Sequence, residues 1–173
     1  MTGVRRGELF ALKWQSFDES RATLFIQEAI YENVIDTPKT SKSIRKIPLS
    51  PALVRLLLDW RKTATRRAPE DFIFAGRDGR PRDHKQIMRD HIKPACKRLG
   101  LQGASWLTFR RTFATWADQN GVSAKQRGEL MGNSAEVNAT VYTQVMDHAS
   151  RSGIERVSGE LFTDCALLSE SVN

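Results

Sequence analysis

The sequence predicts an α+β fold that is mainly α-helical and contains a small antiparallel β-sheet. Several segments carry apolar residues at helical spacing, and one stretch in the N-terminal third is rich in β-branched and aromatic residues. The length of 173 residues is enough to bury one sizeable core and fits one domain of ordinary size better than two. We therefore expect a single compact unit with its strands near the start of the chain.

The first element is expected to be a short helix over residues 4–14. Phe10 and Trp14 lie four positions apart, as on one face of a helix. Strand composition follows, and Asp36-Thr37-Pro38 interrupts it. The residues between this break and the last strand, 38–46, are expected to form an exposed basic turn. The expected strands of the antiparallel sheet cover residues 22–30, 32–35 and 45–49.

The next helix is expected to begin after Ser50, an N-cap residue that is followed by Pro51 in the first turn. Residues 72–74 form a brief apolar run, which predicts a short strand or an extended link. Pro94 is expected to kink or split the helix that contains it. Gly121 marks a helix end and Ser123 the next N-cap. The remaining helices are expected over residues 83–99, 108–120, 123–131 and 136–146.

The charge favours polyanionic partners. The chain has 27 Lys and Arg residues against 20 Asp and Glu residues, a net charge of +7, and the basic residues are spread along the sequence. Such a surface is typical of a folded domain that binds nucleic acid. No apolar run approaches the ~20 residues that span a bilayer, so we expect a cytoplasmic protein.

The cysteines and histidines do not predict a metal site. Cys96 and Cys165 are isolated, and no histidine stands at metal-ligand spacing from either. His84 and His91 would lie roughly 10 Å apart even on one helix. We expect no metal and no other cofactor.

The most informative residues form an ordered series of short motifs. Thr2-Gly3-Val4-Arg5-Arg6-Gly7-Glu8-Leu9 comes first, then Pro38-Lys39-Thr40, Arg110-Arg111-Thr112-Phe113-Ala114-Thr115, Gly132-Asn133-Ser134 and finally Tyr142. A tyrosine hydroxyl, with a pKa of about 10, attacks a phosphate only where cations and donors surround that phosphate. The series resembles the catalytic domain of the tyrosine recombinase, or phage integrase, family over residues 2–142. The resemblance implies that family's mainly helical catalytic core.

The resemblance also implies roles for five residues. In this family a tyrosine attacks a DNA phosphodiester and forms a 3′-phosphotyrosyl bond, without metal or nucleotide. The matching nucleophile is Tyr142, and Arg5 and Arg110 match the two arginines that bind the phosphate, where a planar guanidinium suits nonbridging oxygens. Lys39 matches the general acid of the hairpin, and Asn133 occupies the position of a further phosphate donor.

Neighbouring residues leave alternatives open. Arg6 and Arg111 adjoin the two arginines, but one helical step turns a side chain by ~100°, so one of each pair faces the pocket. Tyr31 is the other tyrosine and lies in an expected strand. The alternatives to Lys39 are the other basic residues of the same turn, Lys42, Arg45 and Lys46.

Departures from the family pattern bear on activity. Leu107 and Asn133 stand where the family has histidine, or in the second case sometimes tryptophan, and leucine cannot exchange a proton. The chain begins four residues before Arg5, so we expect a truncated integrase of a mobile element with a catalytic domain over residues 1–157 and a tail over 158–173. The family acts as a tetramer on two DNA duplexes, so the resemblance implies that this chain binds double-stranded DNA as a homotetramer on paired sites, at the nucleoid of a bacterial cell.

Three other interpretations remain open at this point. The first is a catalytically impaired remnant that only binds DNA, which Leu107 and the early start of the chain favour. The second is a type IB topoisomerase, which shares the chemistry but does not exchange strands between partners. The third is a basic RNA-binding or structural domain.

Overall fold

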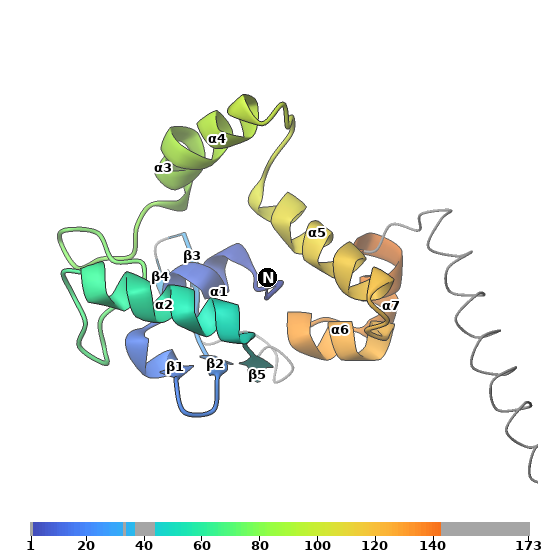
Figure 1. The fold of residues 1–173 in the computed structure, drawn as a ribbon, viewed down its shortest axis with the longest axis horizontal. Helices are drawn as coiled ribbons and strands as arrows, with labels where there is room; N and C mark the ends of the chain where they lie inside the picture. The colour runs from blue at the N-terminus through green and yellow to red at the C-terminus, as the bar shows by residue number, and fades with distance from the viewer. Residues whose placement is uncertain (1, 33, 37–43, 143–173) are drawn as a thin grey trace, which may run out of the picture. The chain divides into compact units, whose positions relative to one another are not determined.

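The computed structural model describes residues 2–32, 34–36 and 44–142, which belong to one compact unit, Met1–Tyr142. The predicted fold class is confirmed, because the described part is mainly helical with short antiparallel strands (Figure 1). The expected basic turn at 38–46 lies mostly outside the described residues, as do the expected tail and its boundary at residue 157.

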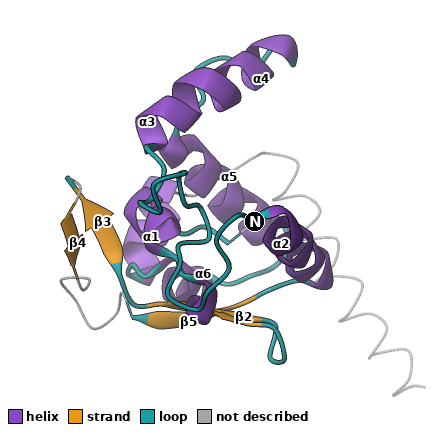
Figure 2. Cartoon of the chain, turned by 90° about the vertical axis from the view of Figure 1, so that its left-hand side faces the viewer, coloured by secondary structure: helices purple, strands orange, loops and turns teal. Residues whose placement is uncertain are grey.

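The strands form two small antiparallel groups. One sheet has the order β1-β2-β5, and its register places Leu24 of β2 opposite Ile47 of β5. Figure 2 shows the second group, β3 with β4, as a separate two-stranded ribbon. The strands are β1 Phe17–Asp18, β2 Thr23–Ile26, β3 Ala29–Tyr31, β4 Val34–Asp36 and β5 Arg45–Pro48.

The single strand expected over 22–30 is therefore wrong, because β2 and β3 pair with different partners. The expected helix over 4–14 is also too long. The α-helix α1 covers Arg6–Ala11, and Trp14–Ser16 forms a separate 3₁₀ turn, η1. Lys13 between them pairs with Phe72 in an isolated antiparallel bridge, so a contact distant in sequence extends the backbone there. Residues 72–74 form this bridge and no regular strand.

The helix α2, Pro51–Thr63, begins as predicted, with the Ser50 hydroxyl accepting a hydrogen bond from the Leu53 N–H. Its inner residues cover a core formed by the β1-β2-β5 sheet and the segments beside it. The buried core residues are Leu12, Trp14, Phe17, Leu24, Ile26, Ile47, Leu49 and Ile73.

The helix expected over 83–99 is continuous and passes through Pro94. Its successive parts are α3 His84–Ile87, the π-helical turn η3 Met88–Ile92 and α4 Lys93–Arg98. A proline cannot donate to the preceding turn and its ring crowds that turn, so the wider π turn accommodates Pro94 without a break.

The last helices build the C-terminal part of the described unit. α5 covers Trp106–Gln119 and α6 covers Ala124–Met131, with Ser123 as the predicted N-cap of α6. Gly132 ends α6 in the left-handed conformation. The helix expected over 136–146 consists, as far as it is described, of α7 Ala135–Val137 and the π turn η4 Asn138–Tyr142.

Candidate active site

Arg5 connects the start of the chain to the end of α6. It precedes α1, and its guanidinium donates one hydrogen bond to the carboxylate of Glu8 at 2.8 Å and another to the carbonyl oxygen of Gly132 at 2.5 Å. The side chain keeps 41% of its surface exposed. Arg5 therefore lies where a ligand can reach it, while its position is fixed from two sides.

Arg110 reaches the same loop from the middle of α5. Its side chain is buried, and it donates to the carbonyl oxygens of Gly3 and of Met131, the latter at 2.7 Å. The structure thus brings both predicted arginines onto consecutive carbonyls, those of Met131 and Gly132. Arg6 and Arg111, the neighbouring alternatives, are exposed residues.

Glu8, which sequence reasoning missed, is the charged group around which this region is arranged. It is 1% exposed, and each carboxylate oxygen accepts two hydrogen bonds, from Arg5 and from Arg45. Burial alone would raise the pKa of Glu8, but the hydrogen bonds and charge of Arg45, with the hydrogen bonds of Arg5, hold the pKa below its ordinary value. The signal available in the sequence was its position three residues after Arg5, typical of a paired helical neighbour.

Arg45 belongs to this buried group and not to a solvated turn. Its side chain is 7% exposed, and its Nε donates to the carbonyl oxygen of Leu130 at 2.7 Å while the rest of the guanidinium pairs with Glu8. We call Arg5, Glu8 and Arg45 the Glu8 cluster. It fixes strand β5, the start of α1 and the end of α6 to one another.

The loop of Met131, Gly132 and Asn133 depends on glycine at its centre. Gly132 has a φ of +71°, and a Cβ there would lie 2.8 Å from Nη1 of Arg45 and 3.1 Å from Nη1 of Arg5. A side chain would therefore displace the arginines as well as strain the backbone.

Asn133 lies beside the arginine contacts and presents a buried amide. Its Oδ1 accepts from Nδ2 of Asn138 at 3.4 Å, and its own Nδ2 is buried without a hydrogen-bond partner among the described residues. A buried donor without an acceptor is rare in proteins, so this nitrogen is a candidate ligand contact.

A second buried group supports Asn133 and was also missed. Arg127 of α6 is 3% exposed and donates from Nε to Oδ1 of Asn138 at 2.9 Å. Its Nη1 contacts the carboxylate of Asp118 at 2.5 Å and the carbonyl oxygen of Val122. We call Arg127, Asn138 and Asn133 the amide network. No motif in the sequence indicated Arg127 or Asn138.

Two further predicted site residues, Tyr142 and Lys39, lie partly or wholly outside the described part of the chain. Tyr142 ends the π turn η4, and its side chain lies outside the described part, as does all of Lys39. Leu107 is 45% exposed on α5, one turn before Arg110. Tyr31, the alternative nucleophile, is 69% exposed on β3.

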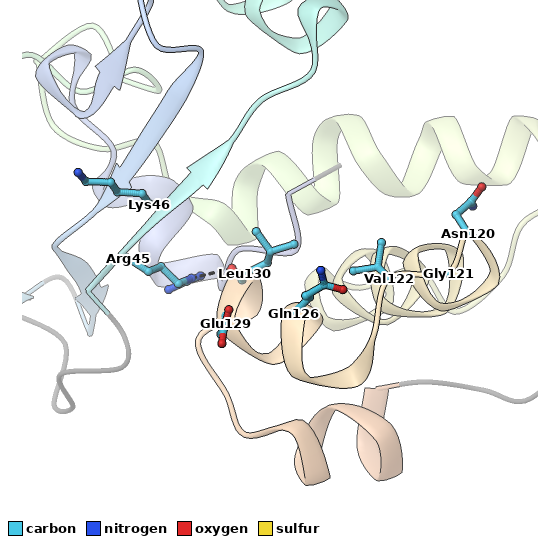
Figure 3. Close-up of a pocket in the computed structure, with 8 residues that line it drawn as sticks. All are labelled: Arg45, Lys46, Asn120, Gly121, Val122, Gln126, Glu129 and Leu130. Carbon is cyan, nitrogen blue, oxygen red and sulfur yellow. Dashed lines mark hydrogen bonds between the residues drawn. The ribbon is translucent and has the colours of Figure 1, made fainter.

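A pocket of about 500 Å³ borders the Glu8 cluster. Figure 3 shows Arg45 extending from β5 toward Leu130, with Lys46 on the same strand and with the link between α5 and α6 and residues of α6 along the other wall. Its lining combines Arg45 and Lys46 with Glu129 and neutral side chains, so it lacks a single strong charge preference.

The described part of the chain contains neither a cluster of metal ligands nor a helix able to span a membrane. No group of three or more His, Cys, Asp or Glu side chains in the described part could hold a metal ion. No helix there combines the length and apolar character that a bilayer span requires.

Comparison with known proteins identifies the class and then the family. The fold is that of a tyrosine recombinase catalytic domain: the Tn1549 transposon integrase, solved in complex with a circular intermediate DNA, matches with a TM-score of 0.72 over 90% of this chain and 55% of that chain, at 21% identity. The model of the phage integrase family matches residues 1–149. The chain belongs to the phage integrase family.

Curated relatives are distant and longer. A XerC-like tyrosine recombinase of Caldanaerobacter subterraneus subsp. tengcongensis is 25% identical over 182 residues, which cover 91% of this chain and 46% of that protein. The ICEBs1 integrase of Bacillus subtilis is 29% identical over 142 residues, which cover 73% of this chain and 38% of the integrase. The chain spans less than half the length of these relatives.

Proposed function

We propose that this chain is the catalytic part of a site-specific DNA recombinase, which cleaves and rejoins DNA strands through a covalent bond to Tyr142. The observation that carries the proposal is the convergence of Arg5 and Arg110 on the consecutive carbonyls of Met131 and Gly132. This loop leads within ten residues to Tyr142. Membership of the phage integrase family supports the same function.

The arginines address the main obstacle to this chemistry. The tyrosine hydroxyl is a weak nucleophile at neutral pH, and attack on a phosphodiester gathers negative charge on the nonbridging oxygens. Guanidinium groups held in place before the reaction stabilise that charge without reorganising. The partial exposure of Arg5 leaves its guanidinium accessible to a phosphate, and the buried Arg110 fixes the loop on which Asn133 lies.

In the proposed reaction, Oη of Tyr142 forms a bond to phosphorus and the bond from phosphorus to the 5′ oxygen breaks. The phenol proton passes to water, and Lys39 gives a proton to the departing 5′ oxygen. A 5′-hydroxyl of the partner strand then attacks the same phosphorus and gives its proton to Lys39, the bond from phosphorus to Oη of Tyr142 breaks, and the released phenolate takes a proton from water. Asn133 donates a hydrogen bond to a phosphate oxygen throughout.

The same proposal assigns residues 1–157 to the catalytic domain and 158–173 to a C-terminal tail. The partner is double-stranded DNA, bound by a homotetramer on paired sites in the cytoplasm, at the nucleoid. The excess of 27 basic over 20 acidic residues supports a polyanionic partner.

A second candidate function is DNA binding without cleavage. Leu107, 45% exposed one turn before Arg110, has no group that can donate to phosphate or exchange a proton. Asn133 can donate but cannot act as an acid or base. Arg5, Arg110 and Asn133 would still bind a phosphate, but neither Leu107 nor Asn133 can transfer a proton at the two positions where the family has histidine.

Covalent trapping separates the two candidates. A pool of duplexes, each nicked just beyond a possible cleavage site, is incubated at low salt with the parent chain, with Tyr142→Phe and with Tyr31→Phe as the matched control. We expect a denaturant-resistant adduct of protein and DNA with the parent and Tyr31→Phe and none with Tyr142→Phe. DNA binding by a folded parent chain without any adduct would favour the binding module.

A further inference from the structure

The amide network has a fixed hydrogen-bond direction. Arg127 carries only donors, so the atom of Asn138 that faces its Nε must be the acceptor Oδ1. The guanidinium is itself held in place by Asp118 and Val122. Asn138 therefore turns its Nδ2 the other way, toward Sδ of Met131 at 3.0 Å and Oδ1 of Asn133 at 3.4 Å.

The orientation of the Asn138 amide also determines the orientation of the Asn133 amide. Because its Oδ1 faces the Asn138 donor, its Nδ2 faces away from the network, and this nitrogen is buried without a partner among the described residues. A series of amides with a cation at one end is also polarised, which strengthens the last N–H as a donor. The group that completes the series must be an acceptor, and an anionic oxygen suits it best.

We propose that Arg127 and Asn138 are positioning residues that hold the Asn133 amide with its NH₂ group directed at a phosphate oxygen of the DNA backbone. The inference rests on the proposed function, since it takes the phosphate bound near Arg5 and Arg110 as the ligand. It assigns a role to two buried residues that the reaction itself does not require. Asn138 is fully buried, so this role is exerted only through Asn133.

The variant that tests the direction is Asn138→Asp. Its carboxylate matches the amide in shape and still accepts from Arg127, but it can no longer donate to Asn133. The Asn133 amide then turns round, donates to the new carboxylate and presents its oxygen to the phosphate. Asn120→Asp is the matched control, because it adds the same charge at an exposed asparagine whose side chain donates to the Trp116 carbonyl and not to the amide network.

The first readout is the side-chain amide resonance of Asn133, measured on the full ¹⁵N-labelled chain with and without a short duplex at low salt. In the parent and in Asn120→Asp we expect this resonance to move on DNA addition, while that of Asn138 moves little. In Asn138→Asp the Asn133 amide resonance should differ from that of the parent before DNA is added, and it should not move further when DNA is added. The same DNA response in all three chains would overturn the inference. If the variant does not fold, the measurement on the parent chain still tests the inference. Equal DNA-induced shifts of the Asn133 and Asn138 amide resonances, or no shift of either, would overturn the inference.

The second readout is the rate of covalent adduct formation on the nicked pool. We expect Asn138→Asp to lower this rate about 10²-fold, as for the loss of one catalytic donor, and to cost nothing further in an Asn133→Ala background. Additive losses would assign Asn138 a structural role only. If the parent forms no adduct but Asn133 responds to DNA as expected, strand cleavage fails and the positioning stands. If the parent and Asn138→Asp form adducts equally fast, the positioning fails and the proposed function stands.

Discussion

Two buried polar groups hold the loop of Met131, Gly132 and Asn133, and they differ in how completely their hydrogen bonds are satisfied. In the Glu8 cluster, each oxygen of the carboxylate accepts two hydrogen bonds from arginines or their backbone. The amide network instead ends at a buried donor, Nδ2 of Asn133, with no acceptor among the described residues. A satisfied group contributes mainly to folding, whereas an unsatisfied one is suited to a ligand.

The largest expected effect follows from removing the carboxylate at the centre of the Glu8 cluster. Glu8→Ala leaves the Arg45 guanidinium, 7% exposed, without its carboxylate, and we expect a loss of about 3–5 kcal/mol in the free energy of unfolding. Urea denaturation of the variant and the parent measures it. Asp59→Ala, which removes the carboxylate of the exposed pair with Lys62, is the control and should change stability little. Equal losses in the two variants would show that the Glu8 cluster does not stabilise the fold.

A smaller loss of stability is expected from placing a side chain at Gly132, in the loop that the two groups hold. Gly132→Ala introduces a Cβ at positive φ within 2.8 Å of Arg45, whereas Gly121→Ala does so at a φ of +79° with no atom within 4 Å. We expect Gly121→Ala to cost about 1–2 kcal/mol from backbone strain and Gly132→Ala to cost clearly more. Thermal unfolding of both variants gives the difference, which reports the contact with the arginines. If the two variants lose equal stability, the arginines move aside for the new Cβ without a measurable loss of free energy.

Local signals explain how much of the fold could be predicted. Ser50 and Ser123 cap helices as expected, because an N-cap depends on residues that adjoin it in the sequence. The end of α1 was wrong because Lys13 pairs with Phe72, which is distant in sequence. The outcome at Pro94 could not be read from the sequence either, since a π turn and a kink relieve the same clash.

In the candidate site, too, local motifs predicted some residues, whereas residues that depend on distant contacts were missed. The motifs around Arg5, Arg110 and Gly132 predicted the arginines and the loop that the structure brings together. Arg45 was considered only as part of a basic turn, because its partner Glu8 lies 37 residues away. The direction of the amide network depends on which atom of Asn138 faces Arg127, and composition and spacing carry no information about that.

The smallest expected effect concerns pH and again separates the two groups. The folded pKa of Glu8 lies below its ordinary value of 4.5, so its contribution to stability is complete above that value and is lost as the pH falls through the folded pKa. The amide network has no carboxylate at its ligand end and adds no such dependence there. The arginines keep Glu8 ionised in the folded chain to a lower pH than in the unfolded chain. Only the first part of the loss in the free energy of unfolding therefore falls between about pH 5 and about pH 4.

Urea midpoints measured across this range should therefore fall with pH more steeply in the parent than in Glu8→Gln, which cannot titrate at this position. Asn133→Ala serves as the comparison from the amide network and should keep the slope of the parent. A slope unchanged by Glu8→Gln would mean that Glu8 has the same pKa in the folded and unfolded chains. The four hydrogen bonds to its carboxylate would then contribute nothing beyond what water offers the unfolded chain, and the contrast between a satisfied and an unsatisfied side of the loop would lose its energetic basis.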